Sequence, residues 1–457
     1  MKAAQQVARD GRLAMSLTTP ERVQKLQTAL HDKAKGAPGY RFYSLYDKIY
    51  RKDVLTHAYL RCWLNDGTAG VDGQTFADIL EQGVGKWLDV LAKELASRTY
   101  RPQPVLRVWI PKPDGKQRPL GIPTIKDRVV QTAVLLVLEP IFEADFSPGQ
   151  YAYRPGRSAH DAVTCVRKLL GAGYREVVDA DLSGYFDSIP HAELMRSVAR
   201  RIVDGTVLQL IKLWLVAPVE ETAEKGERRR TSRNKDVGRG TPQGAPISPL
   251  LSNLYMRRFI VGWKALGHEQ RLDAHIVNYA DDFVICCRGT ADQALTAMRT
   301  ILSRLKLTVN EAKTHVCRLP GDTFDFLGFT FGLYHSPRMR KASLQYWPSR
   351  KRVVRLCATI SEMTDRRYLW REDSEQVAAL NRVLVGWRAY FAQGMFWKAF
   401  RGVDRHVWYR LRWWLSRKHQ VRGSGGATWP LDHLYGVLGL VSLERTAPRI
   451  GFSRAKS

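Results

Sequence analysis

The sequence has few cysteines and no long hydrophobic run. Its six cysteines are scattered over 457 residues without a Cys-x-x-Cys pair, which argues against a zinc knuckle and a disulfide framework and favours reduced, intracellular thiols. The longest apolar stretch, residues 129–138, is interrupted by Gln131 and Thr132 and is shorter than the roughly 20 residues that cross a bilayer. The first residues contain no apolar signal core, so we expect neither export nor a membrane partner.

Acidic residues are also in short supply. The 44 Asp and Glu stand against 72 Lys and Arg, which leaves a net charge of +28 and a pI near 10. A solvated basic surface and a membrane-surface protein are alternatives, but 13 Trp and 18 Tyr offer stacking faces, so nucleic acid is the favoured partner. Residues 333–457 hold 24 Lys and Arg against 8 Asp and Glu, which indicates a separate basic unit.

Short β-like runs alternate with helical patterns through most of the chain. Strands are predicted at residues 105–112, 175–182, 274–280 and 283–288. Helices are predicted at residues 127–139 and 291–305, and amphipathic helices at 380–391 and 403–415 in a region that turns helical after Arg338. The polar stretch 220–240 is expected to be an exposed loop or hairpin insertion. The mixture predicts an α+β core.

Two neighbouring acids, Asp281 and Asp282, stand between two apolar β-like stretches. This pattern predicts a hairpin with the acids at its tip, where adjacent carboxylates repel each other unless a cation is present. Magnesium prefers such hard oxygen ligands and leaves positions for substrate phosphates. An ordinary Asp-Asp turn is the alternative. The two cysteines that follow, Cys286 and Cys287, are expected to be ordinary strand residues.

A second strand that carries acids favours a metal site over an ordinary Asp-Asp turn. Val177, Asp179 and Asp181 occupy alternate positions in residues 176–191, with Asp181 near the end of the predicted strand. One carboxylate from this strand and two from the hairpin tip would suit a two-metal polymerase site. There, one ion activates a primer 3′-hydroxyl and the other neutralises the incoming triphosphate.

In combination these motifs resemble a known family. Residues 279–282 (YADD) match the YxDD box of reverse transcriptases, and residues 179–189 (DADLSGYFDSI) match the motif that supplies their first catalytic aspartate. Further blocks look like those of group II intron reverse transcriptases, at residues 43–73, 118–131, 240–256, 307–316 and 324–331. Residues 380–391 (LNRVLVGWRAYF) resemble the maturase or X domain. The resemblance extends over most of the chain.

The resemblance implies a right-hand polymerase, with fingers and an antiparallel palm sheet followed by an α-helical thumb or maturase (X) domain. The expected divisions are an N-terminal extension (1–39), fingers and palm (40–332), thumb and X domain (333–420) and a short basic DNA-binding remnant (421–457). The paired cysteines and histidines of an HNH endonuclease are absent from this sequence, so bottom-strand cleavage of target DNA is not expected.

The implied activity is RNA-directed DNA synthesis with two Mg²⁺ ions, for which Mn²⁺ is an alternative. The expected partners are deoxynucleoside triphosphates, an RNA template with a DNA primer, target DNA, and the group II intron RNA whose splicing and mobility (retrohoming) the protein would assist. The expected location is cytoplasmic, in a bacterial cytoplasm or nucleoid rather than an organelle. No particular oligomeric state is predicted.

The family's functional residues carry over position by position. The acids implied in catalysis and metal binding, with a backbone carbonyl added as a metal ligand, are Asp181, Asp281, Asp282 and Leu182. The residues implied in nucleotide binding are Lys112, Arg118, Phe186, Gln243 and Lys313. In this set Phe186 would be the steric gate against a ribose 2′-hydroxyl, and Lys313 a general acid toward pyrophosphate. The basic residues expected to contact RNA are Arg388, Arg401, Arg405 and Arg412.

Two nearby acids and two other functions remain as alternatives. Asp179 is expected to be structural and Asp187 to belong to a local turn or cap. The chain as a whole has two rival interpretations: a catalytically silent RNA-binding splicing cofactor, and a host-adopted reverse transcriptase in repair or antiviral defence. The three intact acids argue against the silent cofactor, because a scaffold has no need of clustered carboxylates.

Overall fold

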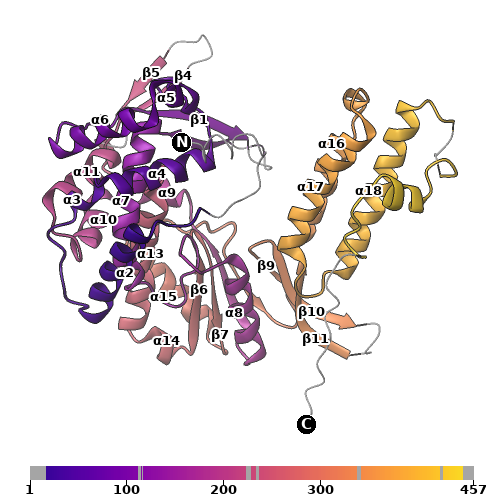
Figure 1. The fold of residues 1–457 in the computed structure, drawn as a ribbon. Coiled ribbons are helices and arrows are strands. Elements are labelled where there is room, and N and C mark those ends of the chain that lie inside the picture. Colours follow the sequence, from indigo (N-terminus) through magenta and orange to yellow (C-terminus); the bar gives the residue numbers. More distant parts are fainter. Residues whose placement is uncertain are drawn as a thin grey trace.

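A computed structural model describes residues 17–111, 115, 117–222, 228–232, 236–336, 341–422 and 426–445. Helices and two sheets occupy the N-terminal two thirds of the chain, and a β-hairpin followed by long helices forms the rest (Figure 1). The chain is mixed α+β, as the sequence predicts. In the described ranges, none of the helices combines the length and the apolar character needed to span a membrane.

One long buried helix, α7 (Ile125–Glu143), packs against three N-terminal helices: α2 (Glu21–Gly36), α3 (Tyr46–Ile49) and α4 (Lys52–Asn65). Helices α5 (Phe76–Gln82) and α6 (Val84–Ala96) pack against each other, and α6 also packs against α4. The helix predicted at 127–139 is present but continues past Pro140. Because proline has no N–H, the Leu136 carbonyl loses its donor within the helix, and Gln27 Nε2 donates to that oxygen at 3.0 Å instead.

A four-stranded sheet follows, in the order β2-β1-β4-β5. Its strands are β1 (Val105–Pro111), β2 (Gln117–Ile122), β4 (Val219–Thr222) and β5 (Arg228–Thr231). Strand β1 pairs antiparallel with β2 and parallel with β4. The polar stretch 220–240 is therefore, in its described part, a hairpin insertion whose first strand extends this sheet.

The second sheet, which we call the central sheet, is antiparallel throughout and has the order β6-β7-β3-β8. Its strands are β3 (Glu176–Asp181), β6 (Ala274–Tyr279), β7 (Asp282–Cys287) and β8 (His315–Arg318). Each predicted strand is present within a residue or two. The helices that contact this sheet are α8 (Ala159–Gly171), α14 (His268–Arg271) and α15 (Ala291–Arg304). The other helices of this region are α9 (Tyr185–Ser188), α10 (His191–Ala199), α11 (Gly205–Leu215) and α13 (Ser248–Ala265).

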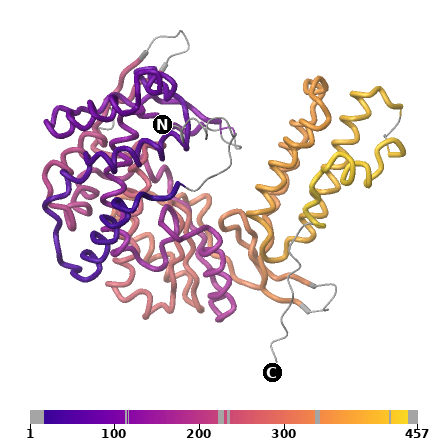
Figure 2. The backbone as a smooth tube through the Cα atoms, in the orientation of Figure 1, coloured from indigo at the N-terminus to yellow at the C-terminus, as the bar shows by residue number. Residues whose placement is uncertain are grey.

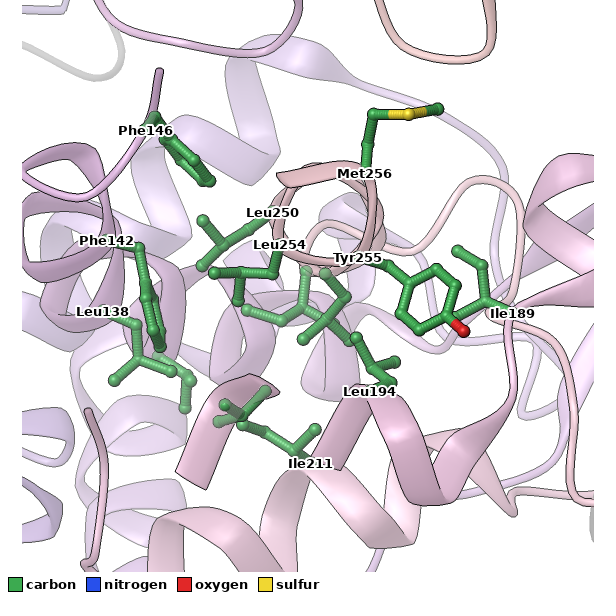
Figure 3. Packing of buried hydrophobic residues seen from close by; sticks show 14 of the residues in the cluster. Leu138, Phe142, Phe146, Ile189, Leu194, Ile211, Leu250, Leu254, Tyr255 and Met256 are labelled. Carbon is green, nitrogen blue, oxygen red and sulfur yellow. The ribbon is translucent and has the colours of Figure 1, made fainter. Parts of the chain in front are cut away.

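Alternate residues of the central sheet enter two different cores. Val178 and Phe283 join the larger core, whereas Val177 and Val284 join the core shared with the C-terminal helices. Successive side chains of a strand point to opposite faces, so the sheet separates these cores. Figure 3 shows the larger core, where side chains of α13 and α7 face each other. Cys286 and Cys287 are buried strand residues without a disulfide, as predicted.

The chain leaves the central sheet through a three-stranded sheet and continues as long helices (Figure 2). The strands are β9 (Phe324–Phe326), β10 (Phe329–Ser336) and β11 (Lys341–Pro348). The helices are α16 (Arg350–Met363), α17 (Asp373–Phe391) and α18 (Trp397–Lys418), with short turns η1 (Arg366–Tyr368) and η2 (His433–Val437). We call residues 350–445 of the described chain the helical unit.

The prediction that the chain turns helical directly after Arg338 is wrong, because residues 341–348 form β11. This strand pairs with β10 so that Phe331 lies opposite Tyr346, and their rings stack with centroids 5.5 Å apart. Buried aromatic packing across the pair therefore overrides the local sequence pattern. The amphipathic helices predicted at 380–391 and 403–415 lie inside α17 and α18.

Candidate active site

The acidic pair stands at the tip of the β6-β7 hairpin. Tyr279 pairs with Asp282, so Ala280 and Asp281 form a two-residue turn. Ala280 takes a positive φ of 59°, a conformation that L-residues adopt at a cost, and Asn278 Nδ2 donates to its carbonyl at 2.7 Å. Asp281 is thereby held at the turn, and Asp282 is the first residue of β7.

The third acid lies on the neighbouring strand. Asp181, the last residue of β3, is directly opposite Asp282 in the antiparallel pairing. Directly paired residues of this kind have Cβ atoms about 4.5–5.5 Å apart on the same face of the sheet. Two of the three predicted catalytic carboxylates are therefore cross-strand neighbours, and the third is the residue before one of them.

Burial and nearby negative charge raise the pKa values of the two acids at the hairpin tip. Burial, followed by the charges of Asp179 and Asp281, raises the pKa of Asp282 to about 7. Burial also raises the pKa of Asp281, with a further contribution from Asp181, while the cations Arg118 and Lys313 oppose the shift. Raised carboxyl pKa values mean that the anionic forms are costly where they stand, and a cation would relieve that cost.

The backbone of Leu182 turns toward the same group. Leu182 bridges to Val309, but the hydrogen bonds of this bridge come from its neighbours: Ser183 N donates to Thr308 O, and Asn310 N donates to Asp181 O, both at 2.9 Å. In an extended strand, adjacent residues direct their peptide groups to opposite sides. The Leu182 carbonyl therefore points away from Val309, to the side on which β7 pairs.

Asp181 accepts two bonds from the segment before β8. Asn310 Nδ2 and Lys313 Nζ each lie 3.0 Å from Asp181 Oδ2. In the parts of the chain that the structure describes, no three His, Cys, Asp or Glu side chains are already gathered around one point. The donor chemistry nevertheless suits magnesium, because three carboxylates and a backbone carbonyl are all hard oxygen ligands.

The predicted nucleotide-binding residues are joined by backbone hydrogen bonds. Gly121 N in β2 donates to the Gln243 carbonyl at 2.6 Å, and Thr241 N donates to the Phe186 carbonyl at 2.8 Å. A side chain on Gly244, which has a φ of 107°, would meet the Gly121 carbonyl at 2.7 Å, so this approach requires glycine. Strand β2, the loop around Gln243 and helix α9 therefore form one connected wall.

The other predicted nucleotide contacts lie beside this wall. Arg118 is exposed on β2, opposite Ile110 of β1, and is near enough to Asp281 to act on its pKa. The ring of Phe186 is partly buried on α9. Lys112 lies outside the described residues.

Tyr153 is a neighbour of the site that the sequence patterns do not identify. It has a φ of 53°, and its side chain is 49% exposed and so about half covered by the protein. This partial burial and the charge of Asp281 raise the pKa of Tyr153, while Arg118 lowers it. Tyr153 therefore stands within electrostatic range of both an acid and a cation of the site. The feature that marks Tyr153 is its positive φ, and neither the composition nor the periodicity of the sequence reveals a backbone conformation.

The two acids expected to be structural lie close to the site. Burial and the charge of Asp325 raise the pKa of Asp179 to about 7, and His315 Nε2 is 3.7 Å from its Oδ2. Asp187 is an exposed residue of α9, and its backbone N donates to the Gly184 carbonyl at 3.0 Å. The turn role expected for Asp187 agrees with this bond.

The four arginines expected to contact RNA have different surroundings. Arg401 is paired with Glu444 at 2.7 Å. Arg412 is half-buried, donates from Nε to the Trp429 carbonyl at 2.6 Å and lies over the Trp408 ring. Arg405 is exposed, and Arg388 is half-buried in the last turn of α17. Arg412 therefore has a packing role of its own.

Comparison with known proteins defines the class of this chain. Residues 110–331 match the family of reverse transcriptases (RNA-dependent DNA polymerases), which implies a polymerase fold of fingers and palm. Residues 353–434 match the maturase-specific domain of group II introns. The chain belongs to the family of group II intron-encoded reverse transcriptases and maturases, an RNA-directed DNA polymerase family.

Its relatives differ in how much of their length is shared. Protein YkfC of Escherichia coli K12 is 35% identical over 350 residues, 67% of this chain and 87% of that protein. The group II intron-encoded protein LtrA of Lactococcus lactis subsp. cremoris is 36% identical over 218 residues, 47% of this chain but only 34% of LtrA. The mitochondrial nuclear intron maturase 2 of Arabidopsis thaliana is 40% identical over 111 residues, 24% of this chain and 15% of that protein.

Proposed function

We propose that this chain extends a DNA primer on an RNA template, with Asp181, Asp281 and Asp282 as its catalytic acids. One observation carries the proposal: Asp181 is paired directly with Asp282 across β3 and β7, and Asp281 is the adjacent residue at the hairpin tip. Burial and neighbouring negative charge raise the pKa values of Asp281 and Asp282, so the ionised forms of these two acids are costly in the folded protein. A cation-dependent reaction accounts for that cost.

Two magnesium ions, or manganese in their place, would be held by these three carboxylates and the Leu182 carbonyl. When bound, the metal supplies charge neutralisation on the phosphates and lowers the pKa of the primer hydroxyl. The chain itself contributes a movable counter-charge, since Lys313 pairs with Asp181 at 3.0 Å and is long enough to turn toward a triphosphate. There it would serve as a general acid toward pyrophosphate.

The wall formed by β2, the Gln243 loop and α9 would bind the incoming nucleotide. Arg118, together with Lys112, would pair with the triphosphate, and a guanidinium fork suits phosphate oxygens. Gln243 would contact the nucleotide from the loop that Gly121 holds. The Phe186 ring would stand where a 2′-hydroxyl would clash, which favours deoxynucleotides.

We propose that residues 333–420 act as thumb and maturase X domain and bind the RNA of a group II intron, aiding splicing and retrohoming. The basic residues assigned to this contact are Arg388, Arg401, Arg405 and Arg412. The domain divisions proposed with it are 1–39, 40–332, 333–420 and 421–457, the last as a DNA-binding remnant for target DNA. The boundary at 332 falls within β10, so the hairpin would belong to both parts.

The test is primer extension on an RNA template with deoxynucleotides and Mg²⁺. Asp281→Asn removes a charge without changing shape, and we expect extension to fall by at least about a hundredfold. Asp292→Asn is the matched control, because Asp292 on α15 is an exposed acid paired with Arg318. Intron RNA affinity should be the same in all three proteins. A folded wild type that binds RNA without extending primers would instead support the silent splicing cofactor.

A further inference from the structure

A groove at the end of α18 lies outside the candidate active site. It has a volume of about 750 Å³ and lies along the helix and the residues just after it, and its lining is Trp408, Tyr409, Arg412, Trp413, Ser416, Arg417, Gln420, Val421 and Arg422. Volumes of this size are typical of small-molecule sites. Helix α18 begins beside β11, where Met395 N donates to Tyr346 O, and ends beside Arg371, whose carbonyl accepts from Lys418 Nζ. The groove is therefore at the end of the helical unit remote from the hairpin.

The lining residues form two rows along the helix. Trp408, Arg412 and Ser416 are spaced by four, and so are Tyr409, Trp413 and Arg417, which puts each row on one line of the helix surface. The first row presents a ring, a guanidinium group and a hydroxyl, and the second presents two rings and a guanidinium group. Tyr409 is 61% exposed, so its ring face is available to a planar ligand.

The charged side chains that line the groove are all positive. Three arginines line it, and among the residues that the structure describes the lining includes neither Asp nor Glu. The Arg417 guanidinium lies 5.7 Å from the Trp413 ring centre, and Arg412 lies 4.2 Å from that of Trp408. Cations held beside aromatic faces suit a ligand that combines a planar ring with an anionic group.

A buried hydroxyl in the groove wall is a separate observation. Ser416 is 6% exposed, and its Oγ has no hydrogen-bond partner in the part of the chain that the structure describes. A buried hydroxyl without a partner is costly, so such groups need an explanation. The oxygen is covered by protein, and rotation of the Ser416 side chain would turn it to a ligand edge at the bottom of the groove, where it would gain a partner.

We propose that this groove binds one unpaired nucleotide of a single-stranded segment. The base stacks on Tyr409 beside Trp413, Ser416 Oγ bonds to the base edge, and Arg417 pairs with the adjacent phosphate. A peptide ligand is disfavoured, because three arginines in a ring-lined groove match a phosphate next to a base. The inference rests on the RNA binding proposed for residues 333–420 and gives it a specific site.

The test is binding of short fluorescent oligouridylate, oligoadenylate and oligothymidylate to the full chain without nucleotides. Tyr409→Leu should weaken binding about tenfold, which corresponds to ~1.4 kcal/mol and lies within the range for one stacked base. Tyr409→Phe keeps the ring and should bind like wild type. Tyr43→Leu, which removes another exposed ring, is the matched control and should have no effect.

Two further variants examine the other contacts. Arg417→Gln should lower the slope of log affinity against log salt by about 0.7, the value for one phosphate contact on a single strand. Ser416→Ala should change the ratio of oligouridylate to oligoadenylate affinity, because the two bases present different edges. Equal losses on oligouridylate and oligothymidylate would assign the site to either nucleic acid, and a loss on oligouridylate alone would assign it to RNA.

The proposal is overturned if Tyr409→Leu binds every oligonucleotide like wild type, or if Tyr409→Phe is as weak as Tyr409→Leu. Repeating the measurement in Asp281→Asn protein separates this result from the polymerase test, because binding requires no primer extension. Failure of extension then leaves the groove result standing, and failure of the groove leaves the catalytic acids standing.

Discussion

Lys313 Nζ lies 3.0 Å from Asp181 Oδ2, so a lysine of the chain neutralises the carboxylate of the first proposed catalytic acid. Asn310 donates to the same oxygen. The side chain of Lys313 is 65% exposed, which leaves it free to rotate about its flexible stem. When a metal ion binds Asp181, the Lys313 ammonium would therefore be released to turn toward the substrate as a proton donor.

Replacing this lysine should separate metal binding from chemistry. In Lys313→Gln we expect kcat for primer extension to fall about a hundredfold, the usual contribution of a general acid. The Mg²⁺ concentration for half-maximal rate should fall as well, because no side-chain cation competes for Asp181. Titrations of Mg²⁺ and deoxynucleotide against extension rate check both effects. Lys351→Gln, which removes an exposed lysine paired with Asp325, should change neither; an unaltered kcat in Lys313→Gln would refute the role.

Selection against ribonucleotides should depend on the bulk of Phe186. In Phe186→Ala we expect the ratio of kcat/KM for deoxynucleotide over ribonucleotide to fall at least tenfold, because the clash with the 2′-hydroxyl is removed. Phe186→Tyr keeps the ring and should retain the selectivity. Single-nucleotide extension with each substrate measures the ratio. If the alanine variant discriminates as well as wild type, the ring is part of the core and not a gate.

The sequence patterns predict the strands that carry the acids, because short and nearly continuous apolar runs mark strands of a sheet buried on both faces. Two features escape such patterns. Strand β11 is stabilised by the contact between Phe331 and Tyr346, and these two residues are too far apart in the sequence for a local pattern to show that they meet. The extension of α7 past Pro140 depends on Gln27, which lies more than a hundred residues upstream. Both are tertiary contacts that override local propensity.

The site shows the same division. The sequence patterns put Asp281 and Asp282 at a hairpin tip and Asp181 near the end of a strand, and the resemblance to reverse transcriptases is what implies that all three are catalytic. Tyr153 escapes because its approach depends on a positive φ in a loop. The pairing of Lys313 with Asp181 also requires the chain to return beside β3 through β8, which periodicity does not specify.

The bond from Gln27 to Leu136 should stabilise the N-terminal helices. In Gln27→Ala the partly buried Leu136 carbonyl would be left without a donor, because Pro140 has none, and we expect a loss of ~1–3 kcal/mol. Thermal unfolding measures this as a lower Tm. Gln24→Ala, on the exposed face of the same helix, should leave Tm unchanged. Equal Tm values for the two variants would show that the bond contributes nothing.

Acid should destabilise the loop that carries Gln243, through His191. Burial lowers the pKa of His191 below its usual 6.5, and its Nε2 bonds to the Gly240 carbonyl at 2.8 Å. A base with a lowered pKa in the folded state is protonated first in the unfolded chain. Its contribution to stability is therefore complete above about pH 6.5 and is lost as pH falls below that value.

His191→Gln tests this sign, because glutamine also donates but does not titrate. The drop in Tm between pH 7.5 and pH 5.5 should be smaller in this variant than in wild type. His335→Gln replaces an exposed histidine of β10 and should leave the drop unchanged. An identical pH dependence in wild type and His191→Gln would assign the acid sensitivity to other groups.

Arg405 and Arg412 should separate RNA affinity from stability. Arg405 is exposed on α18, whereas Arg412 bonds to the Trp429 carbonyl and covers Trp408. We expect Arg405→Gln to lower the slope of log intron-RNA affinity against log salt by about one, with Tm unchanged. Arg412→Gln should lower Tm too, because it removes a half-buried hydrogen bond and a ring contact.

Filter binding over a salt series and thermal unfolding measure the two effects. A normal Tm in Arg412→Gln would show that Arg412 does not contribute to packing. An unaltered salt slope in Arg405→Gln would show that Arg405 makes no phosphate contact. Either result would contradict the assignment of packing and phosphate contact to different arginines of α18.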